Sequence, residues 1–164
     1  MMKKYEFSLR FDVSYYEDDL DFIDDQIYEA GCDDVLIRHG RKAEVLIEFA
    51  RDGLSAIQVL TEAKSQVLSA LPKARLLEAK PDFVGPTDIA DFYGISRQRV
   101  QVIVQSKLAN VHAFTIVGNT QIYRLATVID ELAKHVKQDL DDSVREAAFA
   151  AMQLNLEAER AVSL

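Results

Sequence analysis

The side chains best suited to recognise another molecule lie between residues 96 and 105. Arginines and glutamines there recur on one side of a predicted helix, whereas Val100, Ile103 and Val104 recur on the other side. Arginine can make a bidentate contact with guanine and glutamine with adenine, so this surface has the chemistry to read DNA base edges. The candidate residues of this helix are Ser96, Arg97, Gln98, Arg99, Gln101 and Gln105.

The residues before this helix distinguish it from an ordinary surface helix, on which exposed arginine and glutamine are also common. Thr87 is predicted to be the N-cap of a short helix over Asp88–Tyr93. Gly94 permits a positive φ at the turn that follows, and Ser96 is predicted to cap the second helix. Two short helices joined in this way are typical of a helix-turn-helix, whose second helix enters the DNA major groove.

A predicted hairpin and a further helix follow. Residues 114–124 form two short apolar runs around Gly118 and Asn119, a pattern that indicates a tight hairpin. The next run, Ala126–Val136, has apolar residues at helical spacing. A hairpin in this position is called a wing when it accompanies a helix-turn-helix.

The two segments TDIADFYGISRQRVQVIV and FTIVGNTQIYRLATVIDEL together resemble winged helix-turn-helix domains of the MerR-like and excisionase or phage-regulator type. The resemblance covers residues 84–136. It implies that the second helix reads the major groove and that the wing contacts phosphate or the minor groove. By position it adds three residues around the wing to the candidates, although the wing tip itself has no Arg or Lys: Asn119, Gln121 and Arg124.

The first 80 residues predict a separate α+β domain. Apolar and polar residues alternate over 5–13, which is typical of a half-buried strand. The remaining elements, a helix, a hairpin of two strands, a second helix and a weak fourth strand, are predicted at Tyr16–Ala30, Asp34–Arg38, Glu44–Phe49, Gly53–Ala70 and Ala74–Ala79. The order β-α-β-β-α-β is typical of a ferredoxin-like fold and leaves one sheet face free for a partner or ligand.

The predicted fold class is therefore α+β, with three parts. These are the ferredoxin-like domain at 1–80, an interaction or sensing domain; the winged helix-turn-helix domain at 84–138; and a C-terminal helix within 139–164. The boundary between the first two falls in the proline-containing stretch Lys80–Pro86. The C-terminal helix, with apolar positions from Val144 to Val162, could pack on its own N-terminal domain or pair with a second subunit. The MerR-like resemblance favours pairing, and hence a homodimer.

Charge is distributed unevenly along the chain, whose net charge is −8. Residues 1–82 carry a net charge of −6 and residues 139–164 a net charge of −4, whereas residues 83–138 carry +2. The net-positive segment is the one with the helix-turn-helix, as phosphate binding requires. Cys32 is the only cysteine, which fits a reducing compartment, and no apolar run reaches the roughly 18 residues of a membrane span. We expect a cytoplasmic protein.

The sequence offers little for catalysis. It has no nucleophile–base pair, no phosphate-binding glycine loop and no metal-ligand cluster, and the acidic run over 17–25 lacks EF-hand spacing. We therefore expect no catalytic residues, no cofactor and no metal. The predicted function is sequence-specific binding of double-stranded DNA by a bacterial or phage transcriptional regulator acting as a homodimer. The alternative is a protein-binding adaptor, or an antitoxin-like protein whose N-terminal domain binds a partner protein.

Overall fold

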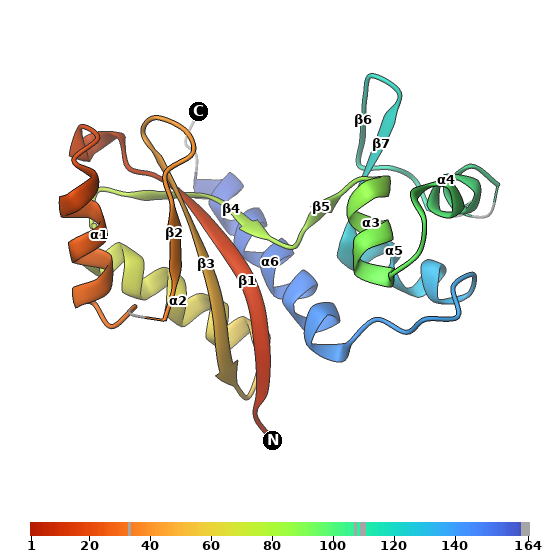
Figure 1. Ribbon diagram of the computed structural model, residues 1–164, viewed down its shortest axis with the longest axis horizontal. Coiled ribbons are helices and arrows are strands. Elements are labelled where there is room, and N and C mark those ends of the chain that lie inside the picture. The colour runs from red at the N-terminus through yellow and green to blue at the C-terminus, as the bar shows by residue number, and fades with distance from the viewer. Residues whose placement is uncertain (33, 107, 109–110, 162–164) are drawn as a thin grey trace.

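The computed structural model describes residues 1–32, 34–106, 108 and 111–161. It is an α+β structure with two antiparallel sheets, each the centre of one lobe. Figure 1 shows the first lobe at the left and the second at the right, with the long helix α6 (Asp142–Ala161) crossing behind β1 and β4.

The first lobe has the element order predicted from its sequence. Its sheet is ordered β2-β3-β1-β4, with every neighbouring pair antiparallel. The elements are β1 (Lys3–Asp12), the 3-10 helix η1 (Ser14–Tyr16), α1 (Leu20–Glu29), β2 (Leu36–Arg38), β3 (Glu44–Gly53), α2 (Ala56–Ala70) and β4 (Arg75–Lys80).

The alternation in β1 separates the two faces of this sheet. Tyr5, Phe7, Leu9 and Phe11 are buried against the helices, and the Phe7 ring stacks on Phe49 of β3 with centroids 4.9 Å apart. Because side chains alternate along a strand, the residues between them, such as Glu6, point to the opposite face. Helices α2 and α6 lie behind the sheet in Figure 1, and no described helix of the first lobe covers the opposite face.

Helix α1 begins later than the predicted Tyr16. Glu17 and Asp18 have φ of 52° and 58°, a left-handed conformation that a right-handed helix cannot include. Asp19 then caps the helix, because its Oδ1 accepts a hydrogen bond from the Phe22 amide at 3.1 Å.

The bounds of β2, β3 and α2 also differ from the predicted ones. Strand β2 starts only at Leu36, and β3 continues to Gly53 instead of ending at Phe49. Helix α2 therefore starts at Ala56 rather than Gly53, with Ser55 as its N-cap. Leu54, inside the predicted helix, precedes the observed one and is 65% exposed.

The second lobe contains a three-stranded sheet, ordered β5-β7-β6, and three helices. Its hairpin turns at Gly118, whose φ is +61°, as the sequence predicted. Strand β5 lies inside the predicted linker and pairs with β7, so this lobe begins before residue 84. The elements are β5 (Phe83–Val84), α3 (Pro86–Tyr93), α4 (Arg97–Ser106), β6 (Thr115–Val117), β7 (Thr120–Arg124) and α5 (Leu125–Ala133).

Helix α6 packs on both lobes of its own chain. Ala150, Ala151 and Leu154 belong to the core of the first lobe, and Ala148 to the core of the second. The small alanine side chains allow this close approach. The inner face of the helix is thus used within the chain, and dimerisation through its outer face stays a prediction. Position 162 of the predicted helix lies outside the described residues.

Candidate nucleic-acid interface

Helix α3 and the turn after it set the direction of α4. The predicted N-cap, Thr87, is wrong: α3 starts at Pro86 with Gly85 as its N-cap, because proline is preorganised for the first helical position. Asp88 Oδ2 accepts a hydrogen bond from the Gly85 amide at 2.9 Å. Gly94 ends the helix with φ +65° and ψ +35°, the left-handed turn that was predicted.

Helix α4 is fixed on the body of the lobe at its start and along one side. Ser96 Oγ accepts a hydrogen bond from the Arg99 amide at 3.1 Å, which confirms the predicted cap. Val100, Ile103 and Val104 are buried in the core of this lobe, together with residues of α3 and α5. The opposite side of α4 is consequently presented to solvent on a fixed support.

The structure places most of the predicted α4 residues on that solvent side. Ser96, Arg97, Gln98, Arg99 and Gln105 are exposed, and Gln101 is partly buried. Arg99 is also held in place, because its Nη2 donates to the His135 carbonyl oxygen at 3.1 Å. The exposed surface includes an apolar residue, Val102, which is 59% exposed.

Lys137 joins this group from a distant part of the sequence. A surface depression of about 370 Å³ is lined by Ile95, Ser96, Arg99, Lys137 and Gln138. Two cationic side chains and the amino end of α4 therefore border one hollow, an arrangement that suits an anion such as a phosphate. Lys137 was not predicted as a site residue. The only feature of the sequence that pointed to it was the net positive charge of residues 83–138.

The hairpin of β6 and β7 is the predicted wing. Asn119 is exposed at the tip, as predicted. Gln121 is partly buried and accepts a hydrogen bond from the Tyr123 hydroxyl at 2.5 Å, which occupies its amide oxygen. Ile116 and Val117 are 62% and 64% exposed, so the hairpin presents apolar side chains to solvent beside the polar Thr115, Asn119 and Thr120.

Arg124 is not available as a wing contact, and its assignment to the DNA-binding set was wrong. Its side chain is 8% exposed, with Nη1 at 2.7 Å from Asp82 Oδ2. The guanidinium also lies over the rings of Phe83 and Phe114, at 4.6 and 5.1 Å from their centroids. The physical reason is that β7 ends at the contact between the lobes, where a buried carboxylate pairs with the arginine.

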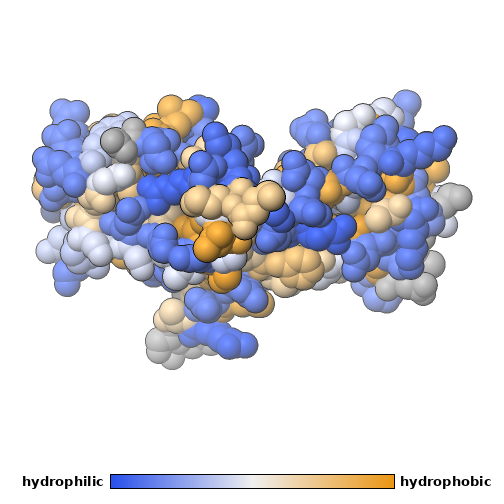
Figure 2. Space-filling view, turned by 90° about the horizontal axis from the view of Figure 1, so that it is seen from below, coloured by the Kyte–Doolittle hydropathy of each residue, from blue (hydrophilic) through white to orange (hydrophobic). Residues whose placement is uncertain are grey.

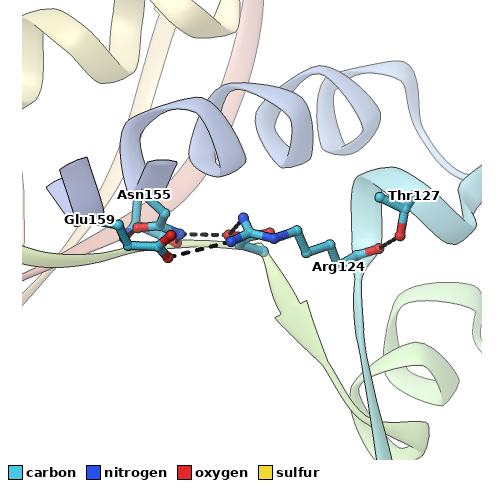
Figure 3. Close-up of polar contacts among 6 residues, drawn as sticks. Arg124, Thr127, Asn155 and Glu159 are labelled. Carbon is cyan, nitrogen blue, oxygen red and sulfur yellow. Dashed lines mark hydrogen bonds and ion pairs between the residues drawn. The ribbon is translucent and has the colours of Figure 1, made fainter. Parts of the chain in front are cut away.

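Asp82, Arg124, Asn155 and Glu159 form what we call the inter-lobe cluster (Figure 3). Asn155 Nδ2 donates to Asp82 Oδ2 at 2.7 Å and to the Ala79 carbonyl oxygen at 2.9 Å, and its Oδ1 accepts from the Ala79 amide at 2.7 Å. Glu159 Oε1 lies 3.4 Å from Arg124 Nη2. The cluster therefore joins β4, the residue before β5, the end of β7 and α6.

Burial raises the pKa of the Asp82 carboxyl above its ordinary value of 3.8, although the hydrogen bond from Asn155 and the charge of Arg124 oppose this shift. A raised folded-state pKa means that the folded protein binds the Asp82 proton more tightly than the unfolded chain does. The resulting stabilisation is present below the unfolded pKa and is lost as pH rises through the folded pKa.

We therefore expect the free energy of unfolding of the wild type, relative to Asp82→Asn, to fall as pH rises from about 4, the ordinary carboxyl pKa, toward neutrality. Urea titrations of both proteins across this range measure the difference. A difference that grows with pH would mean that the Asp82 pKa is lowered on folding.

Within the described part of the chain, no group of three or more His, Cys, Asp and Glu side chains is arranged to hold a metal ion. None of the described helices has the length and apolar character to cross a membrane. No protein-family model matches the chain, and comparisons with curated proteins and with solved structures also found no match.

Proposed function

We propose that this chain is a sequence-specific double-stranded DNA-binding protein, a transcriptional regulator of the bacterial or phage type that acts as a homodimer in the cytoplasm. In this proposal the second lobe is a winged helix-turn-helix domain. The first lobe is a ferredoxin-like domain, an assignment supported by its element order and its strand order β2-β3-β1-β4.

The observation that carries the proposal is the solvent side of α4. Arg97, Gln98 and Gln105 are exposed there, and none of the three makes a side-chain hydrogen bond or ion pair with any described residue. Exposed arginines and glutamines without partners, on a helix held by a buried opposite side, are available for base edges. Arg97 and Arg99 would anchor the helix to phosphate or guanine, and Gln98 and Gln101 would read bases.

The depression beside Ser96 supports the same orientation. With Arg99 and Lys137 on its border, it would receive a backbone phosphate at the amino end of α4. Phosphate contacts of this kind position a protein on the duplex, whereas the base contacts give specificity. The wing has no Arg or Lys at its tip, so it would contribute less to DNA affinity than the wings of proteins with basic tips.

The test uses DNA sites selected in vitro with the purified full chain. We expect Arg97→Ala combined with Gln101→Ala to weaken binding to the selected site by about a hundredfold or more, since each bidentate base contact is worth about 1–3 kcal/mol. A mobility-shift titration measures the loss, with circular dichroism to check the fold.

The matched control is Arg41→Ala combined with Gln58→Ala, which removes the same residue types from exposed positions of the first lobe, away from both α4 and α6. This control should bind the site like the wild type. Unchanged binding by the α4 variant would contradict the proposed reading helix. A palindromic selected site, together with a dimeric mass in solution, would support the homodimer.

The alternative function is a protein-binding adaptor or antitoxin-like protein, and the acidic character of the first lobe favours it. The salt dependence of DNA binding distinguishes the two functions. A sequence-specific DNA-binding protein should lose DNA affinity steeply between low and moderate salt, because binding releases counterions from the phosphates. A preparation that selects no DNA site at any salt concentration would favour the adaptor.

A further inference from the structure

A cleft of about 690 Å³ lies between the open face of the first sheet and the start of the second lobe. One wall comes from β1, β3 and the residues before β2, and the other from β5 and α3. Figure 2 shows the two lobes meeting at a narrower waist. The volume falls in the range of about 300–1,000 Å³ that is usual for small-molecule sites.

The charged lining of the cleft is mostly acidic. Four carboxylates, those of Glu6, Asp34, Glu48 and Asp88, face one ammonium group, that of Lys80. Glu6 is exposed and makes no ion pair or side-chain hydrogen bond with any described residue. Its negative charge is therefore left for solvent or for a ligand.

Two of the other three carboxylates have cationic partners. Glu48 Oε1 lies 3.1 Å from Arg38 Nε, and Asp34 Oδ1 lies 3.5 Å from Arg51 Nη2. Glu48 is paired in register with Ser8, two residues along β1 from Glu6, so Glu6 and Glu48 project from the same sheet face on neighbouring strands. Glu6, which has no cationic partner among the described residues, therefore carries the uncompensated negative charge on this side of the cleft, beside the Glu48–Arg38 ion pair.

The opposite wall is apolar and aromatic apart from Asp88 of α3. Phe92 of α3 is 38% exposed and lines the cleft together with Phe83, Val84 and Val144. Exposed aromatic rings attract cations through their faces and also bury the apolar part of a ligand. An acidic wall opposite an aromatic wall favours a ligand that has both a positive charge and an apolar body.

We propose that this cleft binds a small organic cation, an amine with an apolar body. Its ammonium group lies toward Glu6 and Glu48, and its apolar body packs on Phe92. This site is separate from the α4 surface, and the proposal does not rest on DNA binding. Because the occupant contacts both lobes, it stabilises one arrangement of the second lobe relative to the first.

The test is calorimetric titration of the full chain with three probes of nearly equal shape: phenylbutylamine, phenylbutanol and phenylbutyrate. We expect the amine to bind about tenfold more tightly than the neutral alcohol and the anionic acid to show no binding, because only the charge differs between them. The affinity of the amine should also decrease as sodium chloride is added.

Two variants locate the site. Glu6→Gln combined with Glu48→Gln should weaken amine binding by about tenfold, and Phe92→Ala by about threefold. Glu157→Gln, which removes a carboxylate from an exposed position of α6 outside the cleft, should leave the affinity unchanged. Circular dichroism checks that each variant is folded.

Three results would overturn the proposal. The first is equal affinity for the amine and the alcohol. The second is undiminished amine binding by both cleft variants, which would place the site elsewhere. The third is binding of an oligolysine peptide without any binding of the amine, which would identify the cleft as a surface for a basic protein segment.

Discussion

Replacing Arg124 by leucine is expected to lower the free energy of unfolding by about 3–5 kcal/mol, because breaking a buried ion pair leaves the remaining charge without compensation. Asp82 is fully buried, and Arg124 is its cationic partner at 2.7 Å. The substitution also removes the guanidinium from the rings of Phe83 and Phe114. Urea unfolding followed by circular dichroism measures the loss.

Two further variants test whether the loss comes from the buried ion pair. Glu159→Gln should cost less than about 1 kcal/mol, since Glu159 is 56% exposed and an exposed pair contributes little. Asp82→Leu combined with Arg124→Leu should recover part of the stability lost in Arg124→Leu, because no buried charge is then left alone. A loss below about 1 kcal/mol for Arg124→Leu would show that Asp82 finds other compensation.

Replacing Asn155 by leucine should lower the free energy of unfolding by about 2–4 kcal/mol, since each buried polar group left without a partner costs about 1–3 kcal/mol. The Asn155 amide satisfies both the amide and the carbonyl oxygen of Ala79 near the end of β4, and it also donates to Asp82. Leucine has the same number of side-chain heavy atoms and the same branch at Cγ, so the substitution opens no cavity and the loss reports on the hydrogen bonds. The same urea titration measures it.

The comparison for Asn155 is Gln153→Leu on the same helix. Gln153 is exposed, so its replacement should change the free energy of unfolding by no more than about 0.5 kcal/mol. Equal effects of the two substitutions would mean that the amide of Asn155 is not what holds β4 to α6.

The inter-lobe cluster also bears on the proposed ligand site. Asp82 stands between Pro81 and Phe83, both of which line the cleft. Leu125, the first residue of α5, donates its amide to the Asp82 carbonyl oxygen at 2.7 Å. A cation bound in the cleft would thus lie beside the residues that fix the second lobe, and its effect on DNA affinity can be measured in the same mobility-shift titration.

Much of the local structure could be predicted from the sequence. Alternation in β1, the hairpin at Gly118, the left-handed turn at Gly94 and the Ser96 cap are all properties of a few consecutive residues. Their physical causes act over short distances: side-chain period, glycine backbone freedom and the geometry of a capping oxygen. The errors at the starts of α1 and α3 are local too, since left-handed residues precede α1 and a proline begins α3, whereas α2 starts later than predicted because β3 continues to Gly53.

Part of the candidate site could be predicted because it depends on local sequence pattern. The solvent side of α4 follows from helical periodicity, so the exposure of Arg97, Gln98 and Gln105 could be read from spacing. Lys137 could not, because its place beside Ser96 and Arg99 depends on how α5 and the chain after it fold back. The DNA-binding role of these residues remains a proposal.

Most helices and strands, and the apolar side of each, follow from the sequence because they depend on neighbouring residues, whereas β5 forms by pairing with the distant β7. The fate of charges that meet from distant segments depends on the fold. Arg124 has the residue type and position of a wing contact, but Asp82, 42 residues earlier, and Asn155 and Glu159 of α6 enclose it. A buried ion pair forms only where the fold brings opposite charges together and excludes water, and the spacing of residues along the chain does not record that.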